Sequence, residues 1–303
     1  MAYLSNDLVT SVKARANVPS SQNTFQTADF LRFADEETRS KLIPLIFKNL
    51  EEYYVRTYDY TIVANQAGYS IPTRAVAGKL RDVQLVSSTN DQNRIPLQRL
   101  SPEDLTQMLN GGYSVSKGGF YLEGNKVILF PKPTTASQYN LRLTYYIRPS
   151  TLVDISQCGQ VTAINTSTNQ LTVASVPSTF SVSSPVDFVK ASPGFECSAI
   201  DQMITNIAGQ VLTFSSLPTD IQVGDYVSLA NQSCVVQVPV ELQPLLFQYV
   251  VIRVLAAQSD TVALKAAMAE LRSLEESVMV LISPRVDGKA KRVTNGRGIA
   301  RLV

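Results

Sequence analysis

Leu171-Thr-Val-Ala-Ser-Val-Pro-Ser-Thr-Phe-Ser-Val182 is matched, 41 residues further along the chain, by Leu212-Thr-Phe-Ser-Ser-Leu-Pro-Thr-Asp-Ile-Gln-Val223. After a three-residue difference in length, Val186-Asp-Phe-Val189 aligns with Gly224-Asp-Tyr-Val227. Each copy reads as a strand, a proline turn and two further strands. Two such units that close on each other predict a small β-barrel or β-sandwich.

The repeat lies in a block, residues 151–238, whose composition differs from the rest of the chain. The block is rich in serine and threonine and contains one lysine, no arginine and six carboxylates. Apolar and amphipathic helical patterns lie on both sides of it. We therefore predict an α+β chain with an all-β domain at 151–238 inserted into a core made from 1–150 and 239–283, followed by an extended tail at 284–303.

The first part of the chain begins with helical patterns. Residues 4–17 favour a short helix, and Thr27 or Asp29 is a suitable start for the next one. Pro44 removes a backbone donor, so it should kink or restart that helix. Apolar residues then continue at three- and four-residue spacing, which predicts a helix that ends near Arg56.

A small antiparallel sheet is expected after these helices. The period changes to short runs of β-branched and aromatic residues, separated by Asn, Gly and Pro. The Gly124-Asn125 step predicts a tight turn between two of these strands. The predicted strands are residues 58–63, 68–72, 79–86, 120–122, 126–130 and 139–147.

A long helical hairpin is expected after the β block. Between Leu242 and Ser259 the only charged residue is Arg253, so this helix should be buried almost all round. Ser259 or Asp260 should cap the next helix, whose apolar residues recur in three- and four-residue steps as far as Leu281. Two such helices joined by a short turn form an antiparallel hairpin.

Several classes of function are disfavoured by composition. The 303 residues contain no histidine, which removes the commonest general base and the commonest metal ligand. Cys158, Cys197 and Cys234 are widely spaced and odd in number, which favours reduced, packed thiols. No apolar run approaches the length of a membrane span, and the N-terminus lacks the pattern of a secretory signal. We therefore expect no enzyme activity, no cofactor, no metal and no membrane partner.

The remaining motifs favour structural interpretations. Gly288-Lys289 and Gly296-Arg-Gly298 lack the further glycines of phosphate-binding loops. Asp35-Glu36-Glu37 can pair with nearby cations along a helix, although an acid–base pair or metal site remains an alternative. Asp187 and Asp225 recur in both repeats, which turn hydrogen bonding explains better than calcium binding.

The tail carries the basic character of the chain. From Arg285 to Val303 there are six cations and one acid, which gives this segment a charge of +5. The whole chain has a net charge of +2, so the rest of the chain is acidic. A disordered end, an arm that docks on an acidic partner and a phosphate-binding arm are all open interpretations. Ile299, Leu302 and Val303 could serve as apolar anchors and favour docking over nucleic-acid binding.

Seven stretches of the chain together carry a family pattern: Ala28-Asp-Phe-Leu-Arg-Phe-Ala-Asp-Glu-Glu-Thr-Arg39, Lys48-Asn-Leu-Glu-Glu-Tyr-Tyr54, Tyr60-Thr-Ile-Val63, Gly68-Tyr-Ser-Ile-Pro72, Gly78-Lys-Leu-Arg-Asp-Val83, Pro239–Val280 and Ser283-Pro-Arg-Val-Asp-Gly288. They resemble, in the same order, the head-to-tail adaptor proteins of short-tailed bacteriophages. The resemblance covers roughly two-thirds of the chain and includes no catalytic signature. Residues 151–238 are the departure, because the smallest adaptors lack such a module.

The resemblance implies a structural virion protein of the phage neck, assembled in the host cytoplasm. It implies a ring, usually of twelve copies in that family, below the portal of the capsid. The ring would bind the portal above and tail, nozzle or fibre proteins below, and DNA would pass through without sequence-specific contacts. The implied portal-binding residues are Arg285, Lys289, Lys291, Arg292, Arg297 and Arg301. The implied ring-packing residues are Phe30, Phe33, Leu271, Leu274 and Val278.

A second hypothesis gives the β block a different task. The block could be a receptor- or glycan-binding module carried on the virion, which would need clustered exposed aromatics or a calcium-type group of acids. An enzyme is the third hypothesis, and the missing histidine places it last.

Overall fold

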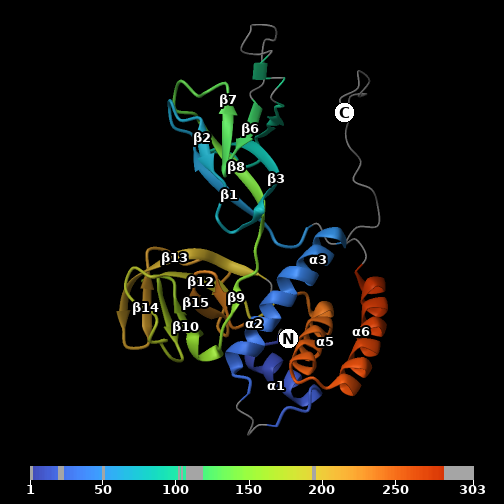
Figure 1. Cartoon of the computed structure of the whole chain (residues 1–303). Helices are drawn as coiled ribbons and strands as arrows, with labels where there is room; N and C mark the ends of the chain where they lie inside the picture. Colours follow the sequence, from blue (N-terminus) through green and yellow to red (C-terminus); the bar gives the residue numbers. More distant parts are fainter. Residues whose placement is uncertain are drawn as a thin grey trace, which may run out of the picture. The chain divides into compact units, whose positions relative to one another are not determined.

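The computed structural model describes residues 3–19, 24–49, 52–101, 103, 105–106, 119–192 and 196–282 (Figure 1). The chain divides into two compact units. The β unit comprises residues 1–7 and 52–239, and the helical unit comprises residues 8–51 and 240–303. The mixture of helices and antiparallel sheets confirms the predicted α+β class. The division into domains at residues 150, 238 and 283 stays a prediction.

The β unit contains two four-stranded sheets and a closed barrel (Figure 1). The first sheet has the order β1-β8-β3-β4, and the second has the order β2-β7-β6-β5. The strands of these two sheets are β1 Val55–Thr61, β2 Gly68–Ser70, β3 Ala75–Ser87, β4 Arg94–Pro96, β5 Gln98–Arg99, β6 Gly119–Glu123, β7 Lys126–Phe130 and β8 Tyr139–Ile147. They share one hydrophobic core, in which Val127, Leu141 and Leu143 are completely buried. The predicted small antiparallel sheet is therefore two sheets packed on each other.

The barrel closes in the order β10-β11-β14-β13-β12-β15. Its strands are β10 Gly159–Asn165, β11 Gln170–Val173, β12 Pro185–Val189, β13 Cys197–Ala208, β14 Val211–Phe214 and β15 Tyr226–Leu229. Alternate inward side chains fill it, with Leu171, Phe188 and Leu212 completely buried. A short parallel pair, β9 Thr151–Leu152 and β16 Gln232–Ser233, joins the segments that enter and leave the barrel.

The sequence repeat appears in the barrel as an internal two-fold symmetry. Leu171 and Leu212 are equivalent in the repeat and pair directly with each other across β11 and β14. On β12 and β15, Phe188 pairs with Val227 and Val189 pairs with Tyr226. Phe188 is equivalent to Tyr226 in the repeat and Val189 to Val227, so exchange of the two copies turns one pair into the other. The Thr162 hydroxyl donates to the Thr172 carbonyl at 3.1 Å, and its counterpart Thr205 donates to Thr213 at 2.9 Å. The barrel is therefore two copies of one unit.

In the helical unit, a π-helical turn interrupts the first long helix. α1 is Ser5–Arg15, α2 is Thr27–Glu37, the π-helix η1 is Thr38–Leu42 and α3 is Ile43–Asn49. Pro44 has no N–H for the preceding turn, and the wider turn of η1 lies directly before it. The predicted restart at Pro44 is confirmed.

The first helical arm ends earlier than the sequence predicts. α3 ends at Asn49 rather than near Arg56, and β1 begins at Val55. Tyr54 has a left-handed backbone with φ of 57°, which a helix cannot continue through. Its side chain is buried, and its hydroxyl donates to the carbonyl oxygen of Gln237 at 2.5 Å. A tertiary contact therefore overrides the helical spacing of the apolar residues.

The C-terminal helices form the predicted hairpin. A short 3-10 turn, η3 Val240–Leu242, leads into α5 Gln243–Ala257, and α6 is Thr261–Leu281 (Figure 1). α5 is buried over most of its circumference, as its composition predicts. The carboxylate of Asp260 accepts the amide of Ala263 at 2.9 Å, which confirms it as the cap of α6.

Among the described residues, the segment Val240–Ala257 is long and apolar enough to cross a membrane by length and composition alone. Most of this segment is buried inside the structure. The core helix of a globular protein passes the same test, and α5 packs against α2 and α6 as such a helix does.

Candidate interaction surfaces

The outward face of α6 carries apolar side chains that nothing in the described chain covers. Val262 and Val280 are 80% and 79% exposed, and Leu281 is 64% exposed. Val262, Ala266, Ala269, Ser273 and Val280 recur at steps of 4, 3, 4 and 7 residues, so they share one face of the helix. We call these five residues the α6 seam. Small and apolar residues at this spacing suit close packing of another helix.

The opposite face of α6 packs within the subunit. The side-chain amide of Gln248 on α5 donates to the Ala267 carbonyl at 2.9 Å, and the Tyr249 hydroxyl donates to Glu275 at 2.7 Å. Val278 is buried on this face, and Leu271 and Leu274 are half-buried. Phe30 on α2 is completely buried and Phe33 half-buried. Packing of these five residues between subunits stays a prediction, and in one subunit they contribute to its own core.

A charged network ties the helical unit together beneath this face. Glu37 is completely buried and pairs with Arg253 and, at 2.8 Å, with Lys41. The Lys41 ammonium lies 4.1 Å from the centre of the Tyr249 ring. Burial and the hydrogen bond to Glu275 raise the pKa of Tyr249, so its hydroxyl stays a proton donor. The predicted pairing of the 35–37 carboxylates with helix cations is confirmed for Glu37.

In the β unit, the barrel and the first sheet are joined by a buried ion pair. Arg74, which precedes β3, donates to both oxygens of Asp187 at 2.7 and 2.8 Å and to Asp201 at 2.6 Å. Asp187 is completely buried and the Arg74 side chain is 6% exposed. Burial alone lowers the pKa of the guanidinium, but the bonds to Asp187 and Asp201 outweigh it and raise that pKa. Arg74 therefore keeps its positive charge, and these three residues form a joint between the barrel and the first sheet.

Further polar contacts surround this joint. Arg56 on β1 donates to the Cys197 carbonyl at 2.9 Å. The Gln237 side-chain oxygen accepts the Ser150 amide at 2.6 Å, and its nitrogen lies 3.2 Å from the Cys197 sulfur. The strands that enter and leave the barrel are thus bonded to its wall.

Arg74 carries no sequence signal of its own, because its partners lie 113 and 127 residues away. The signal that could have indicated it is charge: a block with six carboxylates and one lysine needs cations from elsewhere. The turn interpretation is confirmed for Asp225, which accepts the amide of Gln222 three residues before it, but not for Asp187, whose amide partners lie 14 and 44 residues away. Asp187 accepts the amides of Asp201 and Asn231, and Asp225 accepts those of Ala191 and Gln222, all within 3.0 Å.

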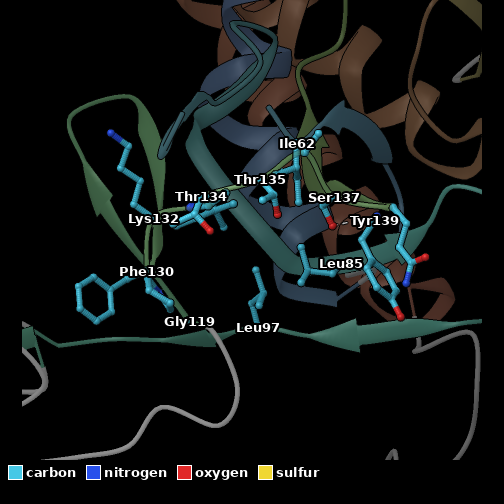
Figure 2. Close-up of a pocket in the computed structure, with 15 residues that line it drawn as sticks. Ile62, Leu85, Leu97, Gly119, Phe130, Lys132, Thr134, Thr135, Ser137 and Tyr139 are labelled. Atoms are coloured by element: carbon cyan, nitrogen blue, oxygen red, sulfur yellow. Dashed lines mark hydrogen bonds between the residues drawn. The ribbon is translucent and has the colours of Figure 1, made fainter. Parts of the chain in front are cut away.

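Two clefts open on the β unit. The larger, of about 660 Å³, lies beside the loop that joins β7 and β8. In Figure 2, Ile62, Leu85 and Leu97 form its apolar floor, and the Lys132 side chain points away from it. It has no charged group placed to orient a ligand. The second, of about 530 Å³, lies beside β1 and is lined by Arg56, Thr57, Tyr58, Tyr60, Pro72, Thr73, Arg74, Tyr145, Ala199, Ile200, Asp201 and Gln202.

The described part of the barrel surface offers no aromatic platform of the kind that the glycan hypothesis needs. Its described aromatic side chains, Phe180, Phe188, Phe214 and Tyr226, are all buried. Within the described ranges, no three His, Cys, Asp or Glu residues are grouped so that they could hold a metal ion. The six predicted portal-binding cations lie at 285–301, outside the described residues.

Comparison with known families decides the class of the protein. The profile of the family SU10 adaptor protein matches residues 5–182, more than half of the chain. The chain belongs to the SU10 adaptor protein family. This is a family of phage adaptors, so the predicted resemblance to phage adaptors is confirmed at that level. A comparison with curated proteins finds no match to the chain.

The family match places the chain among structural phage proteins. It runs through the helices α1–α3, both four-stranded sheets and the barrel strands β10 and β11, and it ends before β12. The second copy and the α5–α6 hairpin lie beyond it. The barrel of this SU10 adaptor therefore extends past the matched region by β12 and the whole second copy.

Proposed function

We propose that this SU10 adaptor is a head-to-tail connector of a short-tailed phage. It forms a ring, of about twelve copies as its family resemblance implies, between the portal and the tail. The ring continues the DNA channel and lies in the neck of the virion. The observation that carries the proposal is the family match over residues 5–182. The alternative receptor- or glycan-binding function has no exposed aromatic platform in the described barrel to support it.

The α6 seam supports assembly into a ring. A ring needs two different complementary faces on each subunit, because identical faces would close a pair. The exposed valines Val262 and Val280 at the two ends of α6 present an apolar strip along a 21-residue helix. Such a strip is costly to leave in water and marks a contact surface.

The basic tail supports binding to the portal. Its six cations favour an acidic surface, and its apolar end adds anchors that a purely electrostatic contact would not need. An arm that becomes ordered on binding loses conformational entropy, so it should anchor on a preformed surface. We propose that 284–303 is this arm and that residues 151–238 are the inserted domain that faces tail proteins.

Binding of arm variants to the portal tests this proposal. A chain that ends at Ile282, and a full-length chain with all six arm cations changed to Gln, are compared with the wild type. The matched control changes three exposed cations outside the arm, Arg99, Lys126 and Arg272, to Gln. We expect both arm variants to lose at least tenfold in affinity for the purified portal of the same phage, and the control to stay within twofold. Arm variants that bind like the wild type would contradict the role of the arm.

A further inference from the structure

β1 is a long open sheet edge, and its exposed carboxylate, Asp59, is bonded to Arg142 on β8 at 2.6 and 2.7 Å. β1 is seven residues long, and Thr57, Asp59 and Thr61 are exposed to solvent. The other edges of the two four-stranded sheets are two or three residues long. β4 also carries Arg94 and Pro96, which discourage strand addition. A long edge with free backbone groups is a template for another strand, so natural proteins cover it.

The register of the sheet identifies the free backbone groups. The Ile147 amide donates to the Tyr54 carbonyl at 2.7 Å, and β1 pairs with β8 without a register shift. In an antiparallel ladder, hydrogen-bonded and non-bonded pairs alternate. Arg56, Tyr58 and Tyr60 therefore bond to β8, and the amides and carbonyls of Val55, Thr57, Asp59 and Thr61 point away from it.

The other neighbour of β8 confirms this assignment. The Ser88 amide donates to the Gln138 carbonyl at 3.0 Å, in register with the β3–β8 pairs. Even-numbered residues of β8 therefore bond to β3, which leaves its odd-numbered residues for β1. The pairing of β8 with β1 and its pairing with β3 therefore identify the same residues of β1 whose backbone groups point away from the sheet.

The 530 Å³ cleft lies against these residues. Thr57 lines it, together with Tyr58, whose side chain is 47% exposed, and Tyr60, whose ring centre is 4.6 Å from that of Tyr58. Arg74 is held by Asp187 and Asp201, and Arg56 donates to the carbonyl oxygens of Cys197 and Ser198. The two cations and two carboxylates at this cleft balance in number, and both cations already have acceptors. The cleft therefore suits an uncharged, partly apolar side chain rather than an ion.

We propose that β1 and the adjoining cleft form a docking site for an extended, uncharged peptide segment of a tail protein. The segment pairs with the outward groups of β1 as an added strand and places a side chain in the cleft beside Tyr58. The proposal rests on the proposed function in one respect, namely that the partner is a tail protein.

A second copy of the chain fits this edge poorly. The barrel is closed and has no free edge, and the remaining sheet edges in the described part of the chain are short. Among the described strands, the long free edge that another copy can offer is β1 itself. Pairing of β1 with β1 uses the same face twice and closes a pair, whereas a ring requires two different faces.

Replacement of Thr57 tests the docking site. Thr57→Pro removes an amide that points away from β8, so the ladder within the sheet is kept, as in edge strands that tolerate proline. Thr57→Val keeps the amide and the branched shape and is the matched control. Each variant is loaded on the portal, purified tail proteins of the same phage are added, and the bound fraction is measured.

The outcomes separate the site from the proposed function. We expect Thr57→Val to bind tail protein within twofold of wild type and Thr57→Pro to lose at least tenfold. Equal binding by both variants overturns the docking site, and loss of ring formation or portal binding by Thr57→Pro assigns the edge to another interface and also overturns it. A wild-type chain that binds neither portal nor tail protein instead contradicts the proposed function.

Hydrogen exchange gives a second readout that needs no variant. In the wild-type chain on the portal, the amides of Thr57, Asp59 and Thr61 should exchange fast, and those of Tyr58 and Tyr60 slowly. Addition of tail protein should slow the first set at least tenfold. Unchanged exchange of these three amides in a complex that contains bound tail protein overturns the docking site.

Discussion

Asp187 and Asp225 occupy equivalent positions in the two repeats, and Asp187 is the one that forms an ion pair with Arg74. Both accept two backbone amides. Asp225 closes a turn through Gln222, whereas Asp187 bonds to Asp201 on β13 and to Asn231 between β15 and β16. Asp187 in addition holds Arg74 with two bonds below 3.0 Å. A duplicated structural carboxylate has thus become the joint between the barrel and the first sheet in one copy of the repeat.

Loss of Arg74 should destabilise the β unit strongly. Arg74→Met keeps the packing of the side chain but leaves the Asp187 carboxylate buried without a cation, which costs about 3–5 kcal/mol. Urea unfolding followed by circular dichroism measures this loss. Arg94→Met, which removes a guanidinium that is 48% exposed, is the control and should shift the midpoint much less. Similar midpoints for the two variants would contradict a structural joint.

The cysteine thiols should be unreactive in the folded chain. Burial raises the pKa of Cys197 from 9.0 to about 11, so at pH 8 about one molecule in a thousand carries the thiolate there. The hydrogen bond with Cys158, together with burial, also raises the pKa of Cys234. A thiol reagent at pH 8 should therefore detect three thiols after denaturation and fewer than one within minutes in the native protein. Rapid native labelling of Cys197 would contradict its raised pKa.

The sign of the accompanying pH effect follows from the raised pKa. Folded Cys197 holds its proton more tightly than the unfolded chain does. Its contribution to the free energy of unfolding is fully present below pH 9 and is lost as the pH rises toward about 11. Cys197→Ser should flatten the stability profile in this range.

At the scale of elements, the barrel repeats one unit about an internal two-fold axis. Leu171 and Leu212 meet on that axis, and both are completely buried. Equivalent positions in a symmetric core have similar surroundings, so equivalent substitutions should have similar costs.

Leu171→Ala and Leu212→Ala should each destabilise the barrel by about 2–5 kcal/mol and by nearly the same amount. The double variant should lose less than the sum, because the two cavities merge where the side chains touch. Denaturant unfolding of the three variants measures these differences. Costs that differ by more than about twofold would show that the symmetry of the backbone does not extend to the packing.

Local patterns in the sequence predicted much of the fold. The repeat, the restart at Pro44 and the buried α5 are visible because each depends on residues that are near in sequence. The end of α3 at Asn49 was missed because Tyr54 is fixed by Gln237, which is 183 residues away. The strand order and the Arg74 joint depend on equally distant contacts, which no periodicity encodes. The open edge of β1 follows from register, and register required the structure.

At the scale of the whole molecule, α6 has one face packed within the subunit and one face exposed to solvent. One face packs on α5 through Gln248 and Tyr249, and the other presents the α6 seam to solvent. The stability of a subunit and its assembly should therefore respond to different substitutions on the same helix.

Charges in the α6 seam should block assembly and leave the subunit folded. Val262→Asp with Val280→Asp places two carboxylates on side chains that are 80% and 79% exposed. We expect the melting temperature to stay within about 2 °C of wild type, as for most surface substitutions. Native mass spectrometry of the portal-bound protein should show loss of the ring. Val182→Asp with Val223→Asp, at exposed valines of the barrel, is the control and should assemble normally.

Electron microscopy of the purified chain, alone and mixed with the portal of its own phage, tests the central claim most directly. The account predicts a closed ring of this protein added to one end of the portal, and no added ring with a chain that ends at Ile282. A wild-type chain that stays monomeric and leaves the portal undecorated would contradict it.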